Sequence, residues 1–280
     1  VAFMNWEEAV QWLMTKPDQQ DLVRACYYDS PRGEAADRYW RSAEWAAIQA
    51  FYPGQGCRRA LDVGAGHGIA SYALARDGWR VAAIEPDPSR LIGAGAIRQL
   101  ASEESLPISV LRAVGEKMPF GDGVFQFIVA RQALHHARDL HALCAEIFRV
   151  LKPGGVFMAL REHVISRQSD LPRFFERHPL HRLYGGENAY RLSEYKSALK
   201  STGFTLYKIL RSFDTVINYA PWTEKTLYAE TIRRIRKLPG GFIFIHRMLP
   251  GSTGFRRLLK CASFMDQRPG RLCSFICSKP

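Results

Sequence analysis

Between residues 59 and 160, short apolar runs alternate with segments of helical periodicity, and this alternation restricts the fold more than any other feature of the chain. The apolar runs have the length of strands and are far too short to span a bilayer. Uninterrupted apolar strands separated by amphipathic helices are typical of a parallel sheet that is covered by helices on both faces. The predicted strands are 59–63, 79–85, 108–113, 124–130 and 156–160, and the predicted helices are 69–77, 89–101 and 140–151.

The sequence on either side of this α/β core predicts additions to it. Residues 4–52 carry apolar and aromatic side chains at helical spacing, which predicts two helices joined by a turn near residues 28–33. A turn is predicted at 152–155, before the fifth strand, and residues 161–192 then interrupt the pattern. A helix is predicted over 193–201, and two further strands over 204–210 and 272–277. We therefore expect an N-terminal helical cap (1–56), a core (57–220 and 271–280) and a basic helical insertion (221–270) before the last strand.

Positive charge is concentrated near the C-terminal end. The formal net charge is +12, and residues 201–280 alone contain 14 Lys/Arg against 4 Asp/Glu. Within 233–260, basic side chains flank the apolar residues 242–245, a pattern that suits a membrane surface or a lipid-linked acceptor. A cap over the active site, an oligomer contact or a solvated basic face explains the same pattern.

Cysteine usage and the N-terminus indicate the compartment. The six cysteines form no C-x-x-C pair and predict small buried side chains in a reducing environment. The chain begins with Val1, and no secretory signal is visible there. We expect a cytoplasmic protein, and the basic segment leaves peripheral membrane association open.

A glycine-rich loop follows the first predicted strand. A dinucleotide-binding loop, G-x-G-x-x-G, would need a third glycine at Ile69. The spacing is instead acidic-x-G-x-G-x-G, from Asp62 through Gly64 and Gly66 to Gly68. Glycines let the backbone approach a ligand closely, and a carboxylate beside them suits an ammonium group better than a pyrophosphate. A nicotinamide dinucleotide is therefore the less favoured ligand.

An acidic residue also ends the second predicted strand. Glu85, followed by Pro86 and Asp87, stands where a carboxylate can accept hydrogen bonds from both hydroxyls of a ribose. Because ligands bind at the carboxyl ends of parallel strands, Glu85 and the glycine loop are expected to face one site.

Further segments follow in order: AVGEKMPFGDGVF at 113–125, VARQALHH at 129–136 and VLKPGG at 150–155. Together with the glycine loop and Glu85, they make residues 58–162 similar to the class I S-adenosylmethionine (SAM)-dependent methyltransferases. The nearest group is the type 11 set that includes the ubiquinone/menaquinone C-methyltransferases. The resemblance implies a Rossmann-like fold with a mostly parallel seven-stranded sheet and helices on both faces.

The resemblance also implies residues that hold SAM. The methionine end would lie along the glycine loop, the ribose at Glu85, the adenine beside Gly115, and the mouth of the acceptor site near Arg131. Relatives often have Asp at the positions of Val114 and Gln126, so the usual contact to the adenine amino group is not expected from position 114. The implied cofactor-binding residues are Asp62, Gly64, Ala65, Gly66, Glu85, Pro86, Gly115, Glu116 and Arg131.

Candidate catalytic residues follow the fourth and fifth predicted strands. His135 and His136 follow the fourth, and Glu162 and His163 follow the fifth. Each could act as a general base toward a hydroxyl or an acidic carbon, although methyl transfer without a protein base is equally open. Residues 178–188 gather His, Tyr, Glu and Arg side chains where relatives often build the acceptor pocket. Histidines 178 and 181 show no third ligand, so no metal site is predicted.

The resemblance implies transfer of a methyl group from SAM to a small or medium-sized organic acceptor, such as a sugar or a natural-product hydroxyl, with S-adenosylhomocysteine as the other product. A SAM-binding or partner-binding protein without catalysis is the main alternative, and a lipid-linked or nucleic-acid acceptor is another. The Asn-Pro-Pro-aromatic signature of enzymes that methylate base amino groups does not follow the fourth strand, which argues against nucleic acid. The oligomeric state stays open.

Overall fold

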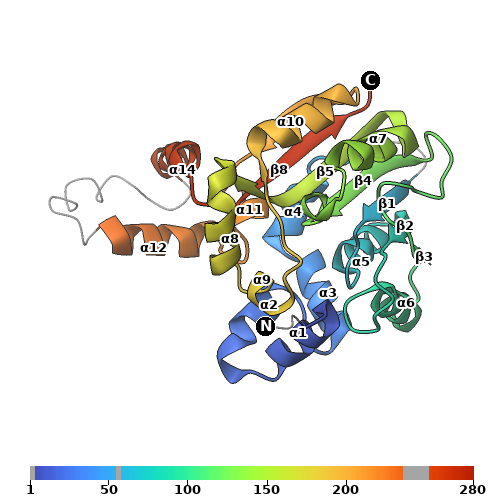
Figure 1. The fold of residues 1–280 in the computed structure, drawn as a ribbon, viewed down its shortest axis with the longest axis horizontal. Helices are drawn as coiled ribbons and strands as arrows, with labels where there is room; N and C mark the ends of the chain where they lie inside the picture. The colour runs from blue at the N-terminus through green and yellow to red at the C-terminus, as the bar shows by residue number, and fades with distance from the viewer. Residues whose placement is uncertain (1–3, 55–57, 236–251) are drawn as a thin grey trace.

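The computed structural model describes residues 4–54, 58–235 and 252–280 (Figure 1). It contains a sheet with the strand order β3-β2-β1-β4-β5-β8-β7, and the short β6 pairs with β5. Strands β1 to β5 are parallel, and β8 is antiparallel to both β5 and β7. The strands are β1 (Arg59–Val63), β2 (Arg80–Ile84), β3 (Ile108–Leu111), β4 (Phe125–Arg131), β5 (Leu151–Ile165), β6 (Tyr190–Arg191), β7 (Thr205–Leu210) and β8 (Arg271–Ser278).

The predicted Rossmann-like α/β fold with a mostly parallel sheet is confirmed, and the sheet gains β6 beyond the seven expected strands. Helices α5 (Ile69–Arg76), α6 (Ala94–Glu103), α7 (Leu140–Val150) and α10 (Leu192–Ser201) are the main helices of the core. The other described helical segments of residues 131–280 are η2 (Leu134–His136), η3 (Gln168–Asp170), α8 (Leu171–Arg177), α9 (His181–Tyr184), α11 (Val216–Tyr219), α12 (Glu224–Ile235) and α14 (Thr253–Met265).

Strand β4 shows why its central residues, from Phe127 to Ala130, are all apolar. Phe127 and Val129 belong to a core cluster that includes the side chains of α5, whereas Ile128 and Ala130 belong to a second cluster with those of α7 and α10. Successive side chains of a strand point to opposite faces, so a strand that is covered on both sides has no polar face.

The fifth strand is longer than predicted. The turn expected at 152–155 lies inside β5 as an irregularity, because the register with β4 shifts between Phe125 and Phe127. The strand continues past residue 160, where Glu162 pairs with Cys273 and His163 with Leu272 of β8. These two residues were expected after the strand, and they lie within it because a partner distant in sequence extends the ladder.

The N-terminal segment contains more helices than the two expected. It consists of α1 (Trp6–Met14), η1 (Pro17–Gln19), α2 (Gln20–Ala25), α3 (Arg32–Trp40) and α4 (Ala43–Gln49). Side chains end and restart the helices: Asn5 and Glu8 form a capping box on α1, and Ser42 caps α4. The helix predicted over 89–101 also starts later, at Ala94, because the Ser89 hydroxyl accepts hydrogen bonds from local backbone amides and forms a turn.

The helices α3 and α4 are joined tightly to the core. Asp77, at the C-terminal end of α5, accepts hydrogen bonds from four side chains of the N-terminal segment at 2.7–2.8 Å, namely Trp40, Trp45, Gln49 and Tyr52. Trp45 and Tyr39 are fully buried in the same cluster as α5 and β4. The N-terminal segment therefore shares a hydrophobic core with the sheet.

The basic insertion is described in part. In Figure 1, α12 and α14 extend to one side of the molecule beyond α11. Arg233 and Arg234 both pair with Glu230, and Arg256 pairs with Glu224, so part of the positive charge is balanced locally. The apolar residues 242–245 and the basic positions 236, 237 and 247 lie outside the described residues.

Two expectations from composition can be compared with the structure. Cys144, Cys273 and Cys277 are buried and free, whereas Cys261 is exposed on the outer face of α14, because its helix covers the core with another face. Position 57 is not described. Among the described helices, none is both long enough and apolar enough to cross a membrane.

Candidate active site

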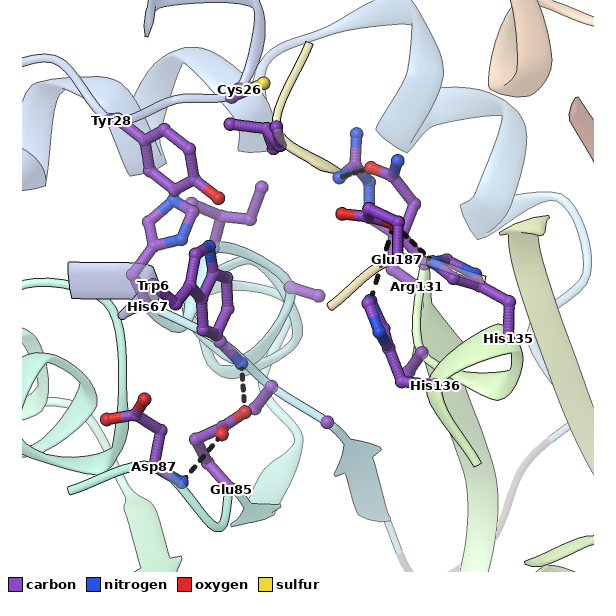
Figure 2. Close-up of a pocket in the computed structure, with 18 of the residues that line it drawn as sticks. Trp6, Cys26, Tyr28, His67, Glu85, Asp87, Arg131, His135, His136 and Glu187 are labelled. Atoms are coloured by element: carbon purple, nitrogen blue, oxygen red, sulfur yellow. Dashed lines mark hydrogen bonds and ion pairs between the residues drawn. The ribbon is translucent and has the colours of Figure 1, made fainter. Parts of the chain in front are cut away.

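A pocket of about 520 Å³ lies where β1, β2 and β4 end. This is the edge of a parallel sheet at which strand-to-helix loops meet and ligands bind. Three groups of residues line it: the loops after these strands, the N-terminal helices, and the segment 178–187. Figure 2 shows Glu85 and Asp87 on one side of the pocket and His135, His136 and Glu187 on the other.

The glycine loop has the backbone conformation that its sequence predicts. Gly64, Gly66 and Gly68 have φ angles of 63°, 55° and 92°, which residues other than glycine rarely adopt. A Cβ atom on Gly64 would lie 2.8 Å from the Cβ of Ala133, so the loops after β1 and β4 can touch only because this side chain is missing. Gly64 donates its amide to Ile84 of β2 at 3.0 Å, which turns the loop toward the pocket.

Glu85 joins two loops of the pocket. Its Oε2 accepts from the Gly66 amide at 2.8 Å and its Oε1 from the Asp87 amide at 3.0 Å. Burial raises the pKa of Glu85 to about 7, although these amides act in the opposite direction and favour the ionised form. The charges of Asp87 and Asp62 raise the pKa further. Glu85 is thus a carboxylate at the pocket wall that can gain or lose its proton near neutral pH.

Asp62 lines the pocket and also fixes α5. Its Oδ2 accepts a hydrogen bond of 2.6 Å from the hydroxyl of Ser71, and burial raises its pKa to about 6. The expected contact of Asp62 with an ammonium group stays a prediction, as do the roles of Ala65 and Pro86, which also line the pocket.

Arg131 lies at the pocket as expected, and its partner comes from the N-terminal segment. The guanidinium contacts Glu44 of α4 at 2.9 Å and stacks over Tyr39 with 5.2 Å to the ring centre. Glu44 is 1% exposed, so this is a buried ion pair. The sequence analysis did not find Glu44, because it lies 87 residues from Arg131 and no local motif marks it.

The two residues expected at the adenine are not among those that line the pocket. A Cβ atom on Gly115 would lie 2.4 Å from a methyl group of Leu143, so packing against α7 requires glycine there. Glu116 accepts from the Arg138 amide at 2.9 Å. Val114 is exposed. The structure thus gives Gly115 and Glu116 local structural roles, and their contact with adenine stays a prediction.

His135 lies between two carboxylates. Its Nδ1 is 2.7 Å from Oε2 of Glu162. Figure 2 shows its contact with Glu187, whose Oε2 lies 3.2 Å from Nε2 of His135. Burial alone would lower the pKa of His135, but the hydrogen bonds and charges of these carboxylates outweigh burial and raise it to about 9. Burial raises the pKa of Glu187, yet His135, His136 and His178 hold it well below the ordinary value.

Glu162 is not among the residues that line the pocket. Its Oε1 accepts from the amides of Ala133 and Leu134 at 3.1 and 3.2 Å, and its Oε2 from the amide and ring of His135. The side chain is fully buried. Both oxygens therefore hold the loop after β4 in place.

His136 and His163 differ in their access to the pocket. His136 lines it with a side chain that is 40% exposed, and its Nδ1 is bound to the carbonyl oxygen of Gly186 at 3.1 Å. His163 is buried behind the lining, and its Nδ1 is bound to the carbonyl oxygen of Gly270 at 3.1 Å. Because a carbonyl can only accept, each Nδ1 carries a proton. Burial lowers the pKa of both rings, that of His136 to about 4.

Two further walls complete the pocket: the sequence analysis did not identify the N-terminal one, and it singled out the other as the segment 178–188. Trp6 and Tyr28 come from the N-terminal segment, and Tyr184 and Glu187 come from the segment after α8. The amide of Met4 donates to the carbonyl oxygen of Leu183 at 3.1 Å, so the two segments are joined beside the pocket. The concentration of polar residues in 178–188 was a usable signal for Glu187, whereas nothing in the local sequence marks Trp6.

Residues 61–159 match the family model described as "Methyltransferase domain". An uncharacterized methyltransferase of Mycobacterium sp. (strain JLS) is 35% identical over 112 residues, which is 40% of this chain and 41% of that protein. A sterol 24-C-methyltransferase of Eremothecium gossypii is 31% identical over 188 residues, covering 61% and 48%. A demethylmenaquinone methyltransferase of Mycobacterium tuberculosis is 34% identical over 123 residues, covering 42% and 45%. The chain thus spans less than half the length of these curated relatives.

Solved structures share the fold across most of the chain. A geranyl diphosphate C-methyltransferase from Streptomyces coelicolor has a TM-score of 0.59 at 15% identity, with 90% of this chain and 85% of that one covered. The [4+2]-cyclase SpnF has a TM-score of 0.54 at 19% identity, with 89% and 81% covered. These similarities confirm the methyltransferase fold, and the cyclase illustrates that one fold serves more than one chemistry.

Proposed function

We propose that this chain transfers a methyl group from SAM to a small or medium-sized organic acceptor, because residues 61–159 match the family model for a methyltransferase domain. One observation carries the proposal: the glycine loop, Glu85 and His136 all line the same pocket. A site of this kind can hold a cofactor and an acceptor side by side, which is how an enzyme accelerates a direct displacement.

The residues present fit SAM. The turn through Gly64 and Gly66 leaves room for close approach of a ligand, since the nearest atoms to a Cβ on Gly66 would be 3.8 Å away. Glu85 presents a buried carboxylate for the ribose hydroxyls, and the charge of Asp62 suits the ammonium group. When bound, SAM would supply an electrophilic methyl group. The volume of about 520 Å³ lies within the range of small-molecule sites.

Among the four residues predicted as bases, we assign proton removal to His136. Glu162 and His163 do not line the pocket, and both ring nitrogens of His135 face carboxylates. His136 is fixed by Gly186 through Nδ1, so its Nε2, which lies 3.8 Å from Oε2 of Glu187, is the nitrogen that would accept a proton from a hydroxyl or an acidic carbon.

For the acceptor, we propose an organic molecule with an apolar body and one ionisable hydroxyl or acidic carbon, such as a sugar-bearing natural product. The support is the mixed wall of the pocket, where Trp6, Leu22 and Leu180 lie opposite polar groups. Proteins similar to this chain are named for sterol, demethylmenaquinone and geranyl diphosphate. A screen of candidate acceptors should therefore also include apolar molecules that are methylated at carbon.

Calorimetric titration of the purified chain with S-adenosylhomocysteine and, separately, with NADH tests the proposal. We expect micromolar binding of the first alone, and a loss of at least about tenfold in affinity for Glu85→Ala, which removes the ribose acceptor. Glu103→Ala, on the exposed face of α6, is the matched control and should bind normally. Absence of binding to the folded wild type, or unchanged binding by Glu85→Ala, would contradict the proposed site.

A further inference from the structure

We propose that His135, His163 and Glu187 bind a divalent transition-metal ion of the zinc class beside the pocket. One nitrogen or oxygen atom from each residue lies within 4.8 Å of the others, and all three side chains are buried. A metal ion placed among such atoms can reach all of them at bonding distance after small side-chain adjustments. This inference goes beyond methyl transfer and does not depend on it.

Both histidines are oriented as metal-binding histidines usually are. His135 is held through Nδ1 by the carboxylate of Glu162, and His163 is held through Nδ1 by the carbonyl oxygen of Gly270. In each ring Nε2 is the nitrogen that remains. A histidine ligand typically donates its other N–H to a carboxylate or carbonyl group in this way, which fixes the ring and increases its basicity.

Glu187 is oriented by the same principle. The hydroxyl of Tyr184 donates to its Oε1, so that oxygen is already used. Its Oε2 is buried, 3.2 Å from Nε2 of His135 and 3.8 Å from Nε2 of His136, and within the described residues neither contact has good hydrogen-bond geometry. Coordination of a cation would give this oxygen a well-aligned partner.

The charges in this cluster also suit a dication. Two buried carboxylates, Glu162 and Glu187, flank the single ring of His135 from opposite sides. A divalent cation bound to Nε2 of His135 would place positive charge between these two carboxylates.

The donor set indicates which metal. Two imidazole nitrogens and one carboxylate oxygen favour zinc, iron, cobalt or nickel over magnesium and calcium, which prefer oxygen ligands. Three protein ligands leave a fourth position open, as in catalytic zinc sites. His135 and Glu187 line the pocket, so this position would face the proposed acceptor.

The chain has no local motif for this site. His135 is 28 residues from His163, which is 24 residues from Glu187 in turn, and the ligands belong to η2, β5 and the loop after α9. Only the meeting of these elements brings them together, which explains why the sequence predicted no metal site.

The test is metal binding by the full chain after treatment with a chelator. We expect calorimetry with Zn²⁺ to show one equivalent bound, and Co²⁺ to develop visible d–d absorption at the same stoichiometry. His163→Ala and Glu187→Gln should each weaken Zn²⁺ binding by more than about tenfold, and Tyr184→Phe, which releases Glu187, by about tenfold. His141→Ala is the control, because this exposed histidine contacts Ser201 on the surface and should bind as the wild type does.

Circular dichroism and titration with S-adenosylhomocysteine on the same samples separate loss of metal from loss of fold or of the cofactor site. If His163→Ala does not fold, Glu187→Gln, which keeps the size of the side chain, decides the question. Failure of the folded wild type to bind one equivalent of either ion overturns the proposal. Unchanged Zn²⁺ binding by folded Glu187→Gln overturns it equally.

Discussion

Glu85 combines a proposed binding role with a folding role in one carboxyl group. It joins the glycine loop to the loop after β2 through two backbone amides, and it is 4% exposed at the wall of the pocket. A carboxylate in this position is prepared for hydroxyl groups of a ligand, but its ionised form is disfavoured by burial until such a ligand arrives.

The stability of the protein should therefore decrease as pH rises through the range set by Glu85. Its pKa is raised from 4.5 to about 7 in the folded state, so between these values the unfolded chain releases the proton first. The free energy of unfolding should fall by up to about 3 kcal/mol across that range. Chemical unfolding at several pH values measures it.

Glu85→Gln should remove most of this decrease, because a neutral side chain has no proton to lose. Asp62, whose pKa is raised from 3.8 to about 6 by burial, should account for a smaller decrease at lower pH that Asp62→Asn removes. If the free energy of unfolding depends on pH identically in the wild type and in Glu85→Gln, burial does not raise the pKa of Glu85.

The turnover number should depend on His136 more than on any neighbouring histidine. His136→Ala should lower kcat by at least about 100-fold while the affinity for S-adenosylhomocysteine stays the same, because the ring is assigned to proton removal. The rate of product formation is measured with an acceptor that the screen identifies. His141→Ala, on the exposed face of α7, should retain full activity. Equal kcat values for the two variants would assign His136 to packing.

At this scale, the sequence predicted what depends on local conformation. Gly64 and Glu85 were identified because a strand, a tight turn and a helix start within a few residues of one another. Glu44 was missed, and Glu187 was found only as part of the segment 178–188, because their contacts join distant segments: an ion pair with Arg131 in one case, and a position beside His135 in the other.

Among the elements, α4 has an effect on the site that its position in the chain does not suggest. Through Glu44 it holds the guanidinium of Arg131 at the end of β4, and Arg161 of β5 approaches the same carboxylate at 3.8 Å. A helix that is distant in the sequence thus contacts the last residue of β4, from which the loop with His135 and His136 starts.

Glu44→Ala should lower the free energy of unfolding by about 3 kcal/mol, because it leaves a buried arginine without its partner. Urea unfolding followed by circular dichroism measures the change. Glu34→Ala, which removes an exposed carboxylate from α3, should change stability by less than about 0.5 kcal/mol. Similar values for both variants would show that water in the pocket solvates Arg131 well enough to replace Glu44.

Predicted and observed elements agree best where periodicity is strong and unbroken. Strands β1, β2 and β4 and helices α5 and α7 lie within a few residues of their expected positions. The differences arise where tertiary pairing decides the outcome, as in β5, where β8 extends the strand through Glu162 and His163. The sequence analysis predicted two long helices in place of the short N-terminal ones, because the apolar spacing continues across caps such as Ser42.

For the molecule as a whole, Asp77 is the main polar connection between the N-terminal segment and the sheet. Its carboxylate accepts four hydrogen bonds from that segment, two of them from the indole groups of Trp40 and Trp45. The expected N-terminal cap, residues 1–56, packs into the core of the sheet: Trp45 and Ile48 are buried among residues of α5 and β4.

Asp77→Ala should destabilise the whole chain by about 3 kcal/mol, since the buried Trp45 and the partly buried Trp40 and Tyr52 lose their acceptor at once. Unfolding should nevertheless remain one transition in which tryptophan fluorescence and far-ultraviolet circular dichroism change together. Asp122→Ala, which removes a highly exposed carboxylate near α7, is the control. Two separate transitions would show instead that the N-terminal helices form an independent unit.

The contact between Met4 and Leu183 has a consequence for how such a protein can change over generations. The glycine loop and Glu85 come from one short stretch of the chain, whereas Trp6 and residues 178–187 reach the same pocket from distant parts of the sequence. Mutations or exchanges at these two places alter the shape of the pocket while the loops after the parallel strands keep their sequence. A lineage can thus acquire new ligands on an inherited scaffold.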